Sequence, residues 1–280
     1  MRDRIIASAH GGPSPEVEGL PAERVDPGRD VMRPVPSLSL TVAIPCFNEA
    51  AIVRDHVRAV LAHLRRSEKA FELLICDDAS TDRTPEALAE LREPELRVLR
   101  YAVGPSRREN LALALREARG EVVAYMDMDL SSGLDRLADL LQAVRSGRAD
   151  IAVGSRRLPG SRTERGVLRR LFSGAYNTTV RLMFPSRVRD HQCGFKALRR
   201  QTLVRLLDLL GYDHTFQRGW FWDAELLIRA QQLGLRIEEI AVRWTEAPKS
   251  SFRFRQEILV ARYMLYSWSR IRRSIRESAR

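Results

Sequence analysis

A short apolar run that ends at two aspartates constrains the possible folds of this chain more than any other feature. Val122–Met126 is apolar and partly β-branched, which predicts a strand buried on both faces of a sheet. Asp127 and Asp129 follow two residues apart, so both point the same way if the alternation of the strand continues. Open α/β folds bind ligands at this end of a strand, and two carboxylates there favour Mg²⁺ or Mn²⁺ over zinc. A pair of solvated loop carboxylates is the alternative, because an Asp-x-Asp pattern alone is weakly specific.

The order of the apolar segments predicts strands that alternate with helices. Strands are predicted at 38–45, 71–76, 96–101, 122–126 and 151–154. Helices are predicted after Asn48 as N-cap, at 85–91, at 109–118, from about 167 and at 221–233. This alternation implies an α/β fold with a mainly parallel central sheet flanked by helices.

Polar side chains follow three of these strands. Asn48 and Glu49 follow the first strand, Asp77 and Asp78 follow the second, and the two aspartates at 127 and 129 follow the fourth. Because parallel strands end at one edge of a sheet, a shared pocket is the simplest explanation. Carboxylates in such a pocket can accept ribose hydroxyls and the N–H groups of a base. The alternative for each residue is a local Asx turn or helix cap.

Composition describes a globular chain with a basic surface. The 280 residues suffice for one large domain or two small ones, and 47 Lys and Arg against 36 Asp and Glu give a net charge of +11. This excess favours anionic partners: nucleic acid, an acidic lipid surface or a phosphorylated substrate. Cys46, Cys76 and Cys193 show no pairing or metal-ligand spacing, which fits a reducing cytosol. No apolar run reaches the roughly 18 residues needed to span a bilayer.

Six ordered motifs resemble those of the family 2 glycosyltransferases. They are Ile-Pro-Cys-Phe-Asn-Glu (44–49), Cys-Asp-Asp-Ala-Ser-Thr-Asp (76–82), Met-Asp-Met-Asp-Leu-Ser (126–131), Arg-Asp-His-Gln-Cys-Gly-Phe-Lys (189–196), Trp-Phe-Trp-Asp-Ala-Glu-Leu-Leu (220–227) and Trp-Thr-Glu-Ala-Pro-Lys-Ser-Ser (244–251). The last three look like the polyprenyl-phosphate hexosyltransferase branch, and within it they are most similar to the dolichyl-phosphate β-glucosyltransferases. The resemblance implies a GT-A fold over residues 38–252.

The resemblance also implies an inverting transfer of a hexose from a nucleotide diphosphate sugar to a polyprenyl phosphate. In it Asp127 and Asp129 hold Mg²⁺ or Mn²⁺ and count as catalytic. Donor-binding positions are matched by Pro45, Asn48, Glu49, Asp77 and Asp78. Two motifs depart from the family. Arg107 stands in a turn, 105–110, that is usually rich in Gly and Lys, and Lys249-Ser250-Ser251 replaces Gly-Ser-Lys.

An arginine-rich segment follows the strand at 151–154. The resemblance places the acceptor phosphate at Arg156, Arg169 and Ser173, and a guanidinium matches phosphate oxygens well. A solvated helix face or contact with lipid headgroups is the alternative. Asp190 and Glu225 are further catalytic candidates, which could bind a sugar hydroxyl, orient an arginine or form a structural ion pair.

The two ends of the chain differ from the middle. Residues 1–37 are rich in Pro, Gly, Glu and Arg and predict a disordered tail. Residues 253–280 have apolar residues at helical spacing among arginines and predict a basic amphipathic helix. This helix could lie in a membrane interface or pack on the main domain.

The prediction is therefore a metal-dependent glycosyltransferase that transfers glucose from UDP-glucose to a polyprenyl phosphate. It is expected in the cytoplasm, peripheral on the inner face of the cell membrane and in contact with an anionic membrane surface. An enzyme with a saccharide or protein hydroxyl as acceptor is the main alternative, and it would need a general base. A nucleotidyltransferase and a nucleic-acid-binding module are further alternatives; acidic strand ends disfavour nucleic acid as a partner.

Overall fold

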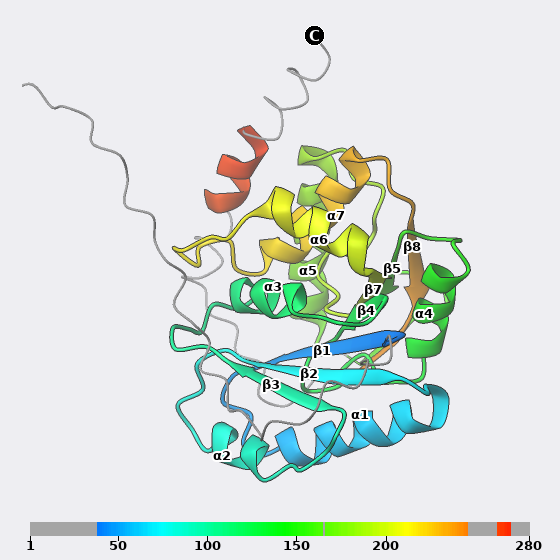
Figure 1. The fold of residues 1–280 in the computed structure, drawn as a ribbon. Helices are drawn as coiled ribbons and strands as arrows, with labels where there is room; N and C mark the ends of the chain where they lie inside the picture. Colours follow the sequence, from blue (N-terminus) through cyan, green and yellow to red (C-terminus); the bar gives the residue numbers. More distant parts are fainter. Residues whose placement is uncertain (1–37, 165, 246–261, 270–280) are drawn as a thin grey trace, which may run out of the picture.

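The computed structural model describes residues 38–164, 166–245 and 262–269. These residues form a mixed α/β fold around a seven-stranded sheet with the order β3-β2-β1-β4-β7-β5-β8 (Figure 1). The strands of this sheet are β1 (Leu40–Cys46), β2 (Phe71–Asp77), β3 (Leu96–Arg100), β4 (Val122–Tyr125), β5 (Ile151–Ser155), β7 (Lys196–Arg199) and β8 (Ile237–Ala241). A separate two-stranded sheet pairs β6 (Arg162–Glu164) with β9 (Arg243–Thr245).

Neighbouring strands of the large sheet run parallel except at β7, which lies antiparallel between β4 and β5. The mainly parallel sheet is confirmed, whereas the antiparallel insertion is not part of the prediction. The strand order reverses at β1, because β2 and β3 follow on one side of it and β4 lies on the other. In open α/β sheets ligands bind at such a reversal, outside the carboxyl ends of the strands, which here are those of β1 and β4.

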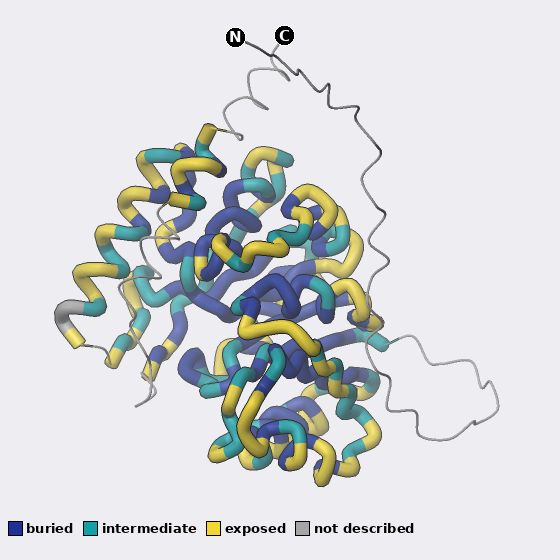
Figure 2. Tube along the Cα trace, turned by 90° about the vertical axis from the view of Figure 1, so that its left-hand side faces the viewer, coloured by how far each residue is buried: buried dark blue, intermediate teal, exposed yellow. Residues whose placement is uncertain are grey.

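Two layers of helices cover the sheet. The helices are α1 (Val53–Ser67), α2 (Thr84–Ala89), α3 (Glu109–Arg116), α4 (Leu137–Arg145), α5 (Val167–Met183), α6 (Arg200–Leu210) and α7 (Phe221–Gln232). Helices α1, α2 and α4 pack on one face, and α3, α6 and α7 pack on the other. Successive side chains of β1 point to opposite faces of the sheet. Val42 packs in the core beneath α1, α2 and α4, and Ala43 packs in the core beneath α3, α6 and α7. Figure 2 shows the strands as the buried centre and the exposed residues along the outer sides of the helices.

The described part of the C-terminal helix, 262–269, packs on the main domain. Met264 joins a cluster of buried apolar residues from α5 and α7, and Trp268 donates its indole N–H to the Met183 carbonyl of α5 at 3.0 Å. Leu265 and Tyr266 are 59% and 56% exposed on the same helix. The helix therefore packs through one side and keeps an apolar pair at the surface.

The five predicted strands are confirmed, with ends shifted by at most two residues. The prediction of Asn48 as an N-cap is wrong, because α1 begins at Val53 after the N-cap residue Ile52. The predicted tail 1–37, the domain end at 246–252 and most of the helix predicted at 253–280 lie outside the described residues. Within the part that is described, no helix is both long enough and apolar enough to span a bilayer.

Candidate active site

The carboxyl ends of β1 and β2 are joined by hydrogen bonds at one edge of the sheet. The Asp78 amide donates to the Cys46 carbonyl at 2.9 Å, and the Asn48 amide donates to Ser80 Oγ at 3.0 Å. Asn48 has a φ of 58°, a region that asparagine enters more readily than most residues. Its Oδ1 accepts the Thr81 amide at 2.8 Å. Asn48 therefore ties the loop after β1 to the loop after β2, which explains why it does not cap α1.

The carboxylates of Asp77 and Asp78 accept hydrogen bonds from different segments of the chain. Asp77 Oδ1 accepts the backbone amide three residues later at 2.9 Å, whereas its buried Oδ2 has no hydrogen-bond partner among the described residues. Asp78 accepts the Ser106 hydroxyl at 2.8 Å, the Arg107 amide at 2.9 Å and the Asn110 side-chain amide at 2.6 Å. Asp78 thus positions the segment between β3 and α3. A donor-binding role stays a prediction for both aspartates.

Asp127 and Asp129 lie in a tight turn directly after β4. Asp129 Oδ1 accepts the Ser131 amide at 3.0 Å, which closes the turn. His56 of α1 contacts the Met128 carbonyl through Nδ1 at 2.8 Å and holds the turn against the helix layer. Both aspartates remain partly exposed. Their carboxylates are therefore partly accessible to solvent at the carboxyl end of β4.

A buried network of charges supports Asp127. Arg108 donates Nη2 to Asp127 Oδ1 at 2.8 Å and Nε to Asp223 Oδ2 at 3.0 Å. Asp223 also accepts Lys196 Nζ at 2.6 Å and the Tyr125 hydroxyl at 2.9 Å. Burial opposes the charge of Asp223, but Lys196 and Arg108 outweigh this effect and hold the pKa of its carboxyl below the ordinary value. Asp223 is absent from the predicted site. Its helix also carries Glu225 and Arg229, so no local feature of the sequence distinguishes Asp223.

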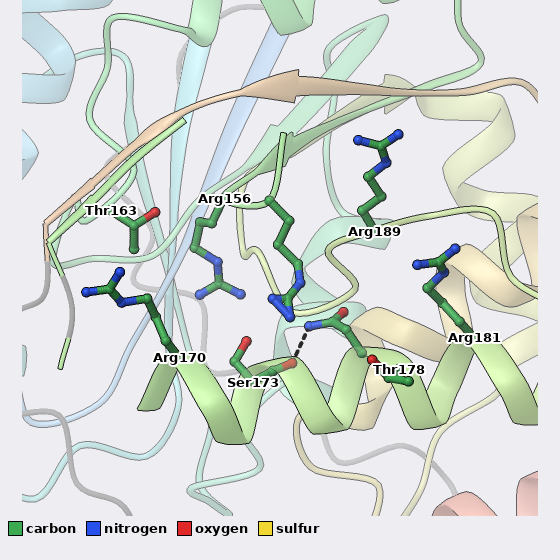
Figure 3. Close-up of a pocket in the computed structure, with 9 residues that line it drawn as sticks. Arg156, Thr163, Arg170, Ser173, Thr178, Arg181 and Arg189 are labelled. Atoms are coloured by element: carbon green, nitrogen blue, oxygen red, sulfur yellow. Dashed lines mark hydrogen bonds between the residues drawn. The ribbon is translucent and has the colours of Figure 1, made fainter. Parts of the chain in front are cut away.

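A pocket of about 400 Å³ lies between α5 and the segment that follows β5 (Figure 3). It is lined by Arg156, Arg157, Thr163, Arg170, Ser173, Asn177, Thr178, Arg181 and Arg189. Five of these residues are arginines and none is acidic, so this arginine pocket attracts anions.

The arginine pocket contains two of the three residues predicted for an acceptor phosphate. Arg156 and Ser173 line it, and Arg170 lines it in place of its neighbour Arg169. Arg170, Ser173, Asn177 and Arg181 recur at three- and four-residue steps and so share one face of α5. Arg169 precedes Ser173 by four residues and borders this face, but it is not among the residues that line the pocket.

Asp190 orients Arg156, which directly follows the carboxyl end of β5. Its Oδ2 accepts Arg156 Nε at 2.7 Å, and its Oδ1 accepts Nη2 at 2.8 Å. The guanidinium also lies over the Trp244 ring, 4.7 Å from the centroid. Burial works against the charged carboxylate, yet Arg156 lowers the pKa of Asp190 to about 2. Of the roles expected for Asp190, the geometry supports orientation of an arginine.

The family model described as Glycosyl transferase family 2 matches residues 41–207, more than half of the chain. The chain belongs to this family. Glycosyltransferase AglD of Haloferax volcanii is 36% identical over 230 residues, covering 81% of this chain and 35% of that protein. The chain thus spans about a third of this relative.

Two further relatives match most of their own length. Dolichyl-phosphate beta-glucosyltransferase ALG5A of Trichomonas vaginalis is 27% identical, covering 80% of this chain and 71% of that protein. Polyprenol monophosphomannose synthase of Mycolicibacterium smegmatis is 30% identical, covering 81% of this chain and 85% of that protein. Among solved structures, glucosyl-3-phosphoglycerate synthase of Mycobacterium tuberculosis with UDP has a TM-score of 0.59 at 19% identity, covering 82% of this chain and 79% of that one. This likeness shows the GT-A fold.

The side chains at the turn of this family 2 domain fit Mg²⁺ or Mn²⁺. Asp127 and Asp129 offer carboxylate oxygens, and the Ser131 hydroxyl beside them is buried with no hydrogen-bond partner among the described residues. The described part of the chain holds no cluster of three or more His, Cys, Asp or Glu side chains suited to a metal. These ions are often held by one or two carboxylates together with substrate phosphates and water, so two aspartates are sufficient.

Glu225 lies apart from this network in the family 2 domain. Its carboxylate pairs with Arg229 at 3.4 Å and with Arg218 at 3.8 Å. No hydrogen bond or ion pair joins it to Arg108 or Asp127 within the described ranges. The geometry therefore supports the structural ion pair that was the alternative for Glu225.

The remaining predicted donor residues lie on strands and loops at the same edge. Pro45 is half-buried in β1, and the Glu49 amide donates to Thr84 Oγ1 at 2.8 Å. The Arg107 guanidinium lies 5.4 Å from the centroid of the Trp220 ring. The loop at 249–251, whose sequence departs from the family motif, lies outside the described residues.

Proposed function

We propose that this chain is a metal-dependent, inverting glycosyltransferase that transfers a hexose from a nucleotide diphosphate sugar to a polyprenyl phosphate. The arginine pocket carries the proposal, because a site with five arginines and no acid in its lining suits a phosphate acceptor. The names of two relatives, a dolichyl-phosphate beta-glucosyltransferase and a polyprenol monophosphomannose synthase, support a lipid phosphate as that acceptor.

A phosphate acceptor changes what the protein must do. Its oxygen is already anionic at neutral pH, so no side chain has to remove a proton before the sugar is attacked. Arg156, Arg170 and Ser173 would bind and align the phosphate, and Asp190 keeps Arg156 in place for this. The same arginines reduce the repulsion between two phosphate-bearing substrates.

The donor would bind at the edge of the sheet where β1, β2 and β4 end. We assign its nucleotide to the residues of the first two loops, Pro45, Asn48, Glu49, Asp77 and Asp78, together with Arg107. Asp127 and Asp129 would hold Mg²⁺ or Mn²⁺, and this ion supplies positive charge to the diphosphate leaving group when bound. The proposed donor is UDP-glucose, on the motif resemblance to dolichyl-phosphate β-glucosyltransferases.

A polyprenyl phosphate has to be reached at a membrane, so we propose that the protein is peripheral on the cytoplasmic face. Leu171, Phe172 and Leu182 are 64%, 59% and 78% exposed on α5, the helix that also lines the arginine pocket. Exposed apolar residues beside basic ones are typical of helices that lie in a membrane interface.

The test uses two acceptors that differ only in the phosphate group. Purified protein with Mn²⁺ receives radiolabelled UDP-glucose or GDP-mannose, and either polyprenyl phosphate or the corresponding polyprenol. We expect labelled lipid from UDP-glucose with polyprenyl phosphate, and none with polyprenol, with EDTA or with Asp127→Asn. Labelling from GDP-mannose alone would change the proposed donor sugar. Transfer to polyprenol, or to a saccharide without any lipid labelling, would contradict the phosphate acceptor.

A further inference from the structure

A buried arginine already occupies one side of the proposed metal ligand Asp127. The Arg108 side chain is 3% exposed, and its Nη2 lies 2.8 Å from Asp127 Oδ1. Asp127 itself is 28% exposed, so one carboxylate oxygen carries a fixed cation while the group still faces solvent. A charge-assisted hydrogen bond of this length is among the stronger polar contacts in proteins.

Arg108 is held in this position from several sides. Its Nε is bound to Asp223, which is 2% exposed and also accepts Lys196 and Tyr125. The Trp220 ring centroid lies 5.5 Å from the guanidinium carbon of Arg108. A guanidinium anchored through Nε can rotate or shift little, so Arg108 remains beside Asp127 when a ligand enters.

Gly194 closes the remaining side of this contact. A Cβ built at Gly194 would lie 2.6 Å from Asp127 Oδ1 and 2.7 Å from Arg108 Nη2. Real Cβ atoms do not approach other atoms so closely. The backbone therefore packs directly against the pair, and the ion pair is a built part of the site.

The local charge decides how a metal ion can bind here. Asp127 and Asp223 are paired with Arg108 and Lys196, so these two carboxylates and two fixed cations balance. Asp129, two residues from Asp127 in the same turn, adds one negative charge. A divalent ion alone would make the site positive and would be repelled by Arg108 at short range. A nucleotide diphosphate brings several negative charges, which offset both cations.

We propose that Arg108 is a resident cation of the donor site that suppresses binding of free divalent metal and makes the metal bind together with the nucleotide diphosphate. This inference rests on the proposed function, because it takes Asp127 and Asp129 as the metal ligands. It adds a residue that sets the order of binding. Arg108 acts on the metal through Asp127 and is a positioning residue that also contributes charge to the diphosphate.

The test measures Mn²⁺ affinity directly, by the electron paramagnetic resonance signal of free Mn²⁺, with and without UDP. Wild type should bind Mn²⁺ at least about tenfold more tightly with UDP than without it. In Arg108→Gln the affinity without UDP should rise about tenfold, because Asp127 loses its competing cation. Arg108→Lys retains the charge and should behave as wild type. Arg116→Gln removes an exposed arginine of the same helix, paired with Asp208, and is the matched control.

The outcomes separate the inference from the proposed function. Unchanged Mn²⁺ affinity without UDP in folded Arg108→Gln overturns the inference and leaves the function intact. Absence of Mn²⁺ binding in wild type even with UDP overturns the metal site and the inference with it. Asp223 keeps Lys196 and Tyr125 as partners in the variant, and circular dichroism checks the fold. Should Arg108→Gln fail to fold, Arg108→Met, which fills a similar volume, gives the same comparison.

Discussion

Asp190 binds Arg156 through both carboxylate oxygens, at 2.7 Å to Nε and 2.8 Å to Nη2, and both side chains are buried. The pair lies at the wall of the arginine pocket, where Arg156 is one of the lining residues. A bidentate contact fixes the plane of the guanidinium as well as its position. The direction in which Arg156 meets an anion is therefore set by Asp190.

This pair makes a prediction about stability and pH. Asp190→Asn leaves a buried guanidinium without its partner charge, and we expect the free energy of unfolding at pH 7 to fall by about 2 to 4 kcal/mol. The folded pKa of about 2 lies below the unfolded value, so the contribution of Asp190 is present above about pH 4 and is lost as the pH falls towards 2. Urea unfolding of both proteins at pH 7, 4 and 2.5 measures the difference. A difference that does not shrink at low pH would contradict this account.

The arginine pocket predicts which of two neighbouring arginines serves the acceptor. Arg170→Ala should raise the KM for polyprenyl phosphate about tenfold, because it removes one charge-assisted contact, and should leave the KM for the donor unchanged. Arg169→Ala is the matched control and should change either value by less than about twofold. Steady-state kinetics with varied lipid and donor measure both. A larger effect of Arg169→Ala on the lipid KM would show that the pocket is not the acceptor site.

The architecture was predictable where the signal is local. Apolar runs followed by polar residues mark β1, β2 and β4, because a strand buried on both faces is mostly apolar and its end meets water. Strand β7 was not predicted, since it has only four residues and includes Lys196, whose charge is paired with Asp223. The pairing that makes a buried lysine acceptable lies 27 residues away in the sequence.

The candidate site likewise contains residues that local spacing predicts and residues that only long-range contacts bring together. Two residues of spacing are enough to predict that Asp127 and Asp129 share a direction at a strand end, and their role as metal ligands stays a prediction. The contact between Arg108 and Asp223 is not predictable in this way, because it joins positions 115 residues apart and depends on how α7 lies against the sheet. The sequence also does not predict that Arg170 rather than Arg169 lines the pocket, because the two neighbours differ by only one helix position.

Gly194 provides a steric test of the turn after β4. In Gly194→Ala the new methyl group would press on the Asp127 carboxylate, and we expect the affinity for UDP with Mn²⁺ to fall about tenfold or more. Gly166→Ala is the control, because a Cβ there meets no atom of the described residues within 4 Å. Isothermal titration measures the affinities, and circular dichroism confirms that both variants fold. Binding by Gly194→Ala as tight as that of wild type would place the donor diphosphate away from Asp127.

The helix at 262–269 has a buried and an exposed apolar residue within one turn, which allows its packing and the proposed membrane contact to be tested separately. Leu265 and Tyr266 are exposed, and Tyr266 keeps a ring contact with Tyr263 at 6.0 Å between centroids. Replacing both with Glu should therefore lower the melting temperature less than Met264→Glu does, while reducing sedimentation with anionic vesicles, where a buried carboxylate is costly. Met264 is 9% exposed and belongs to the cluster with α5 and α7, so Met264→Glu should lower the melting temperature. Undiminished sedimentation of the Leu265→Glu, Tyr266→Glu protein would assign the helix to packing alone. The apolar surface of α5 would then have to supply any membrane contact by itself.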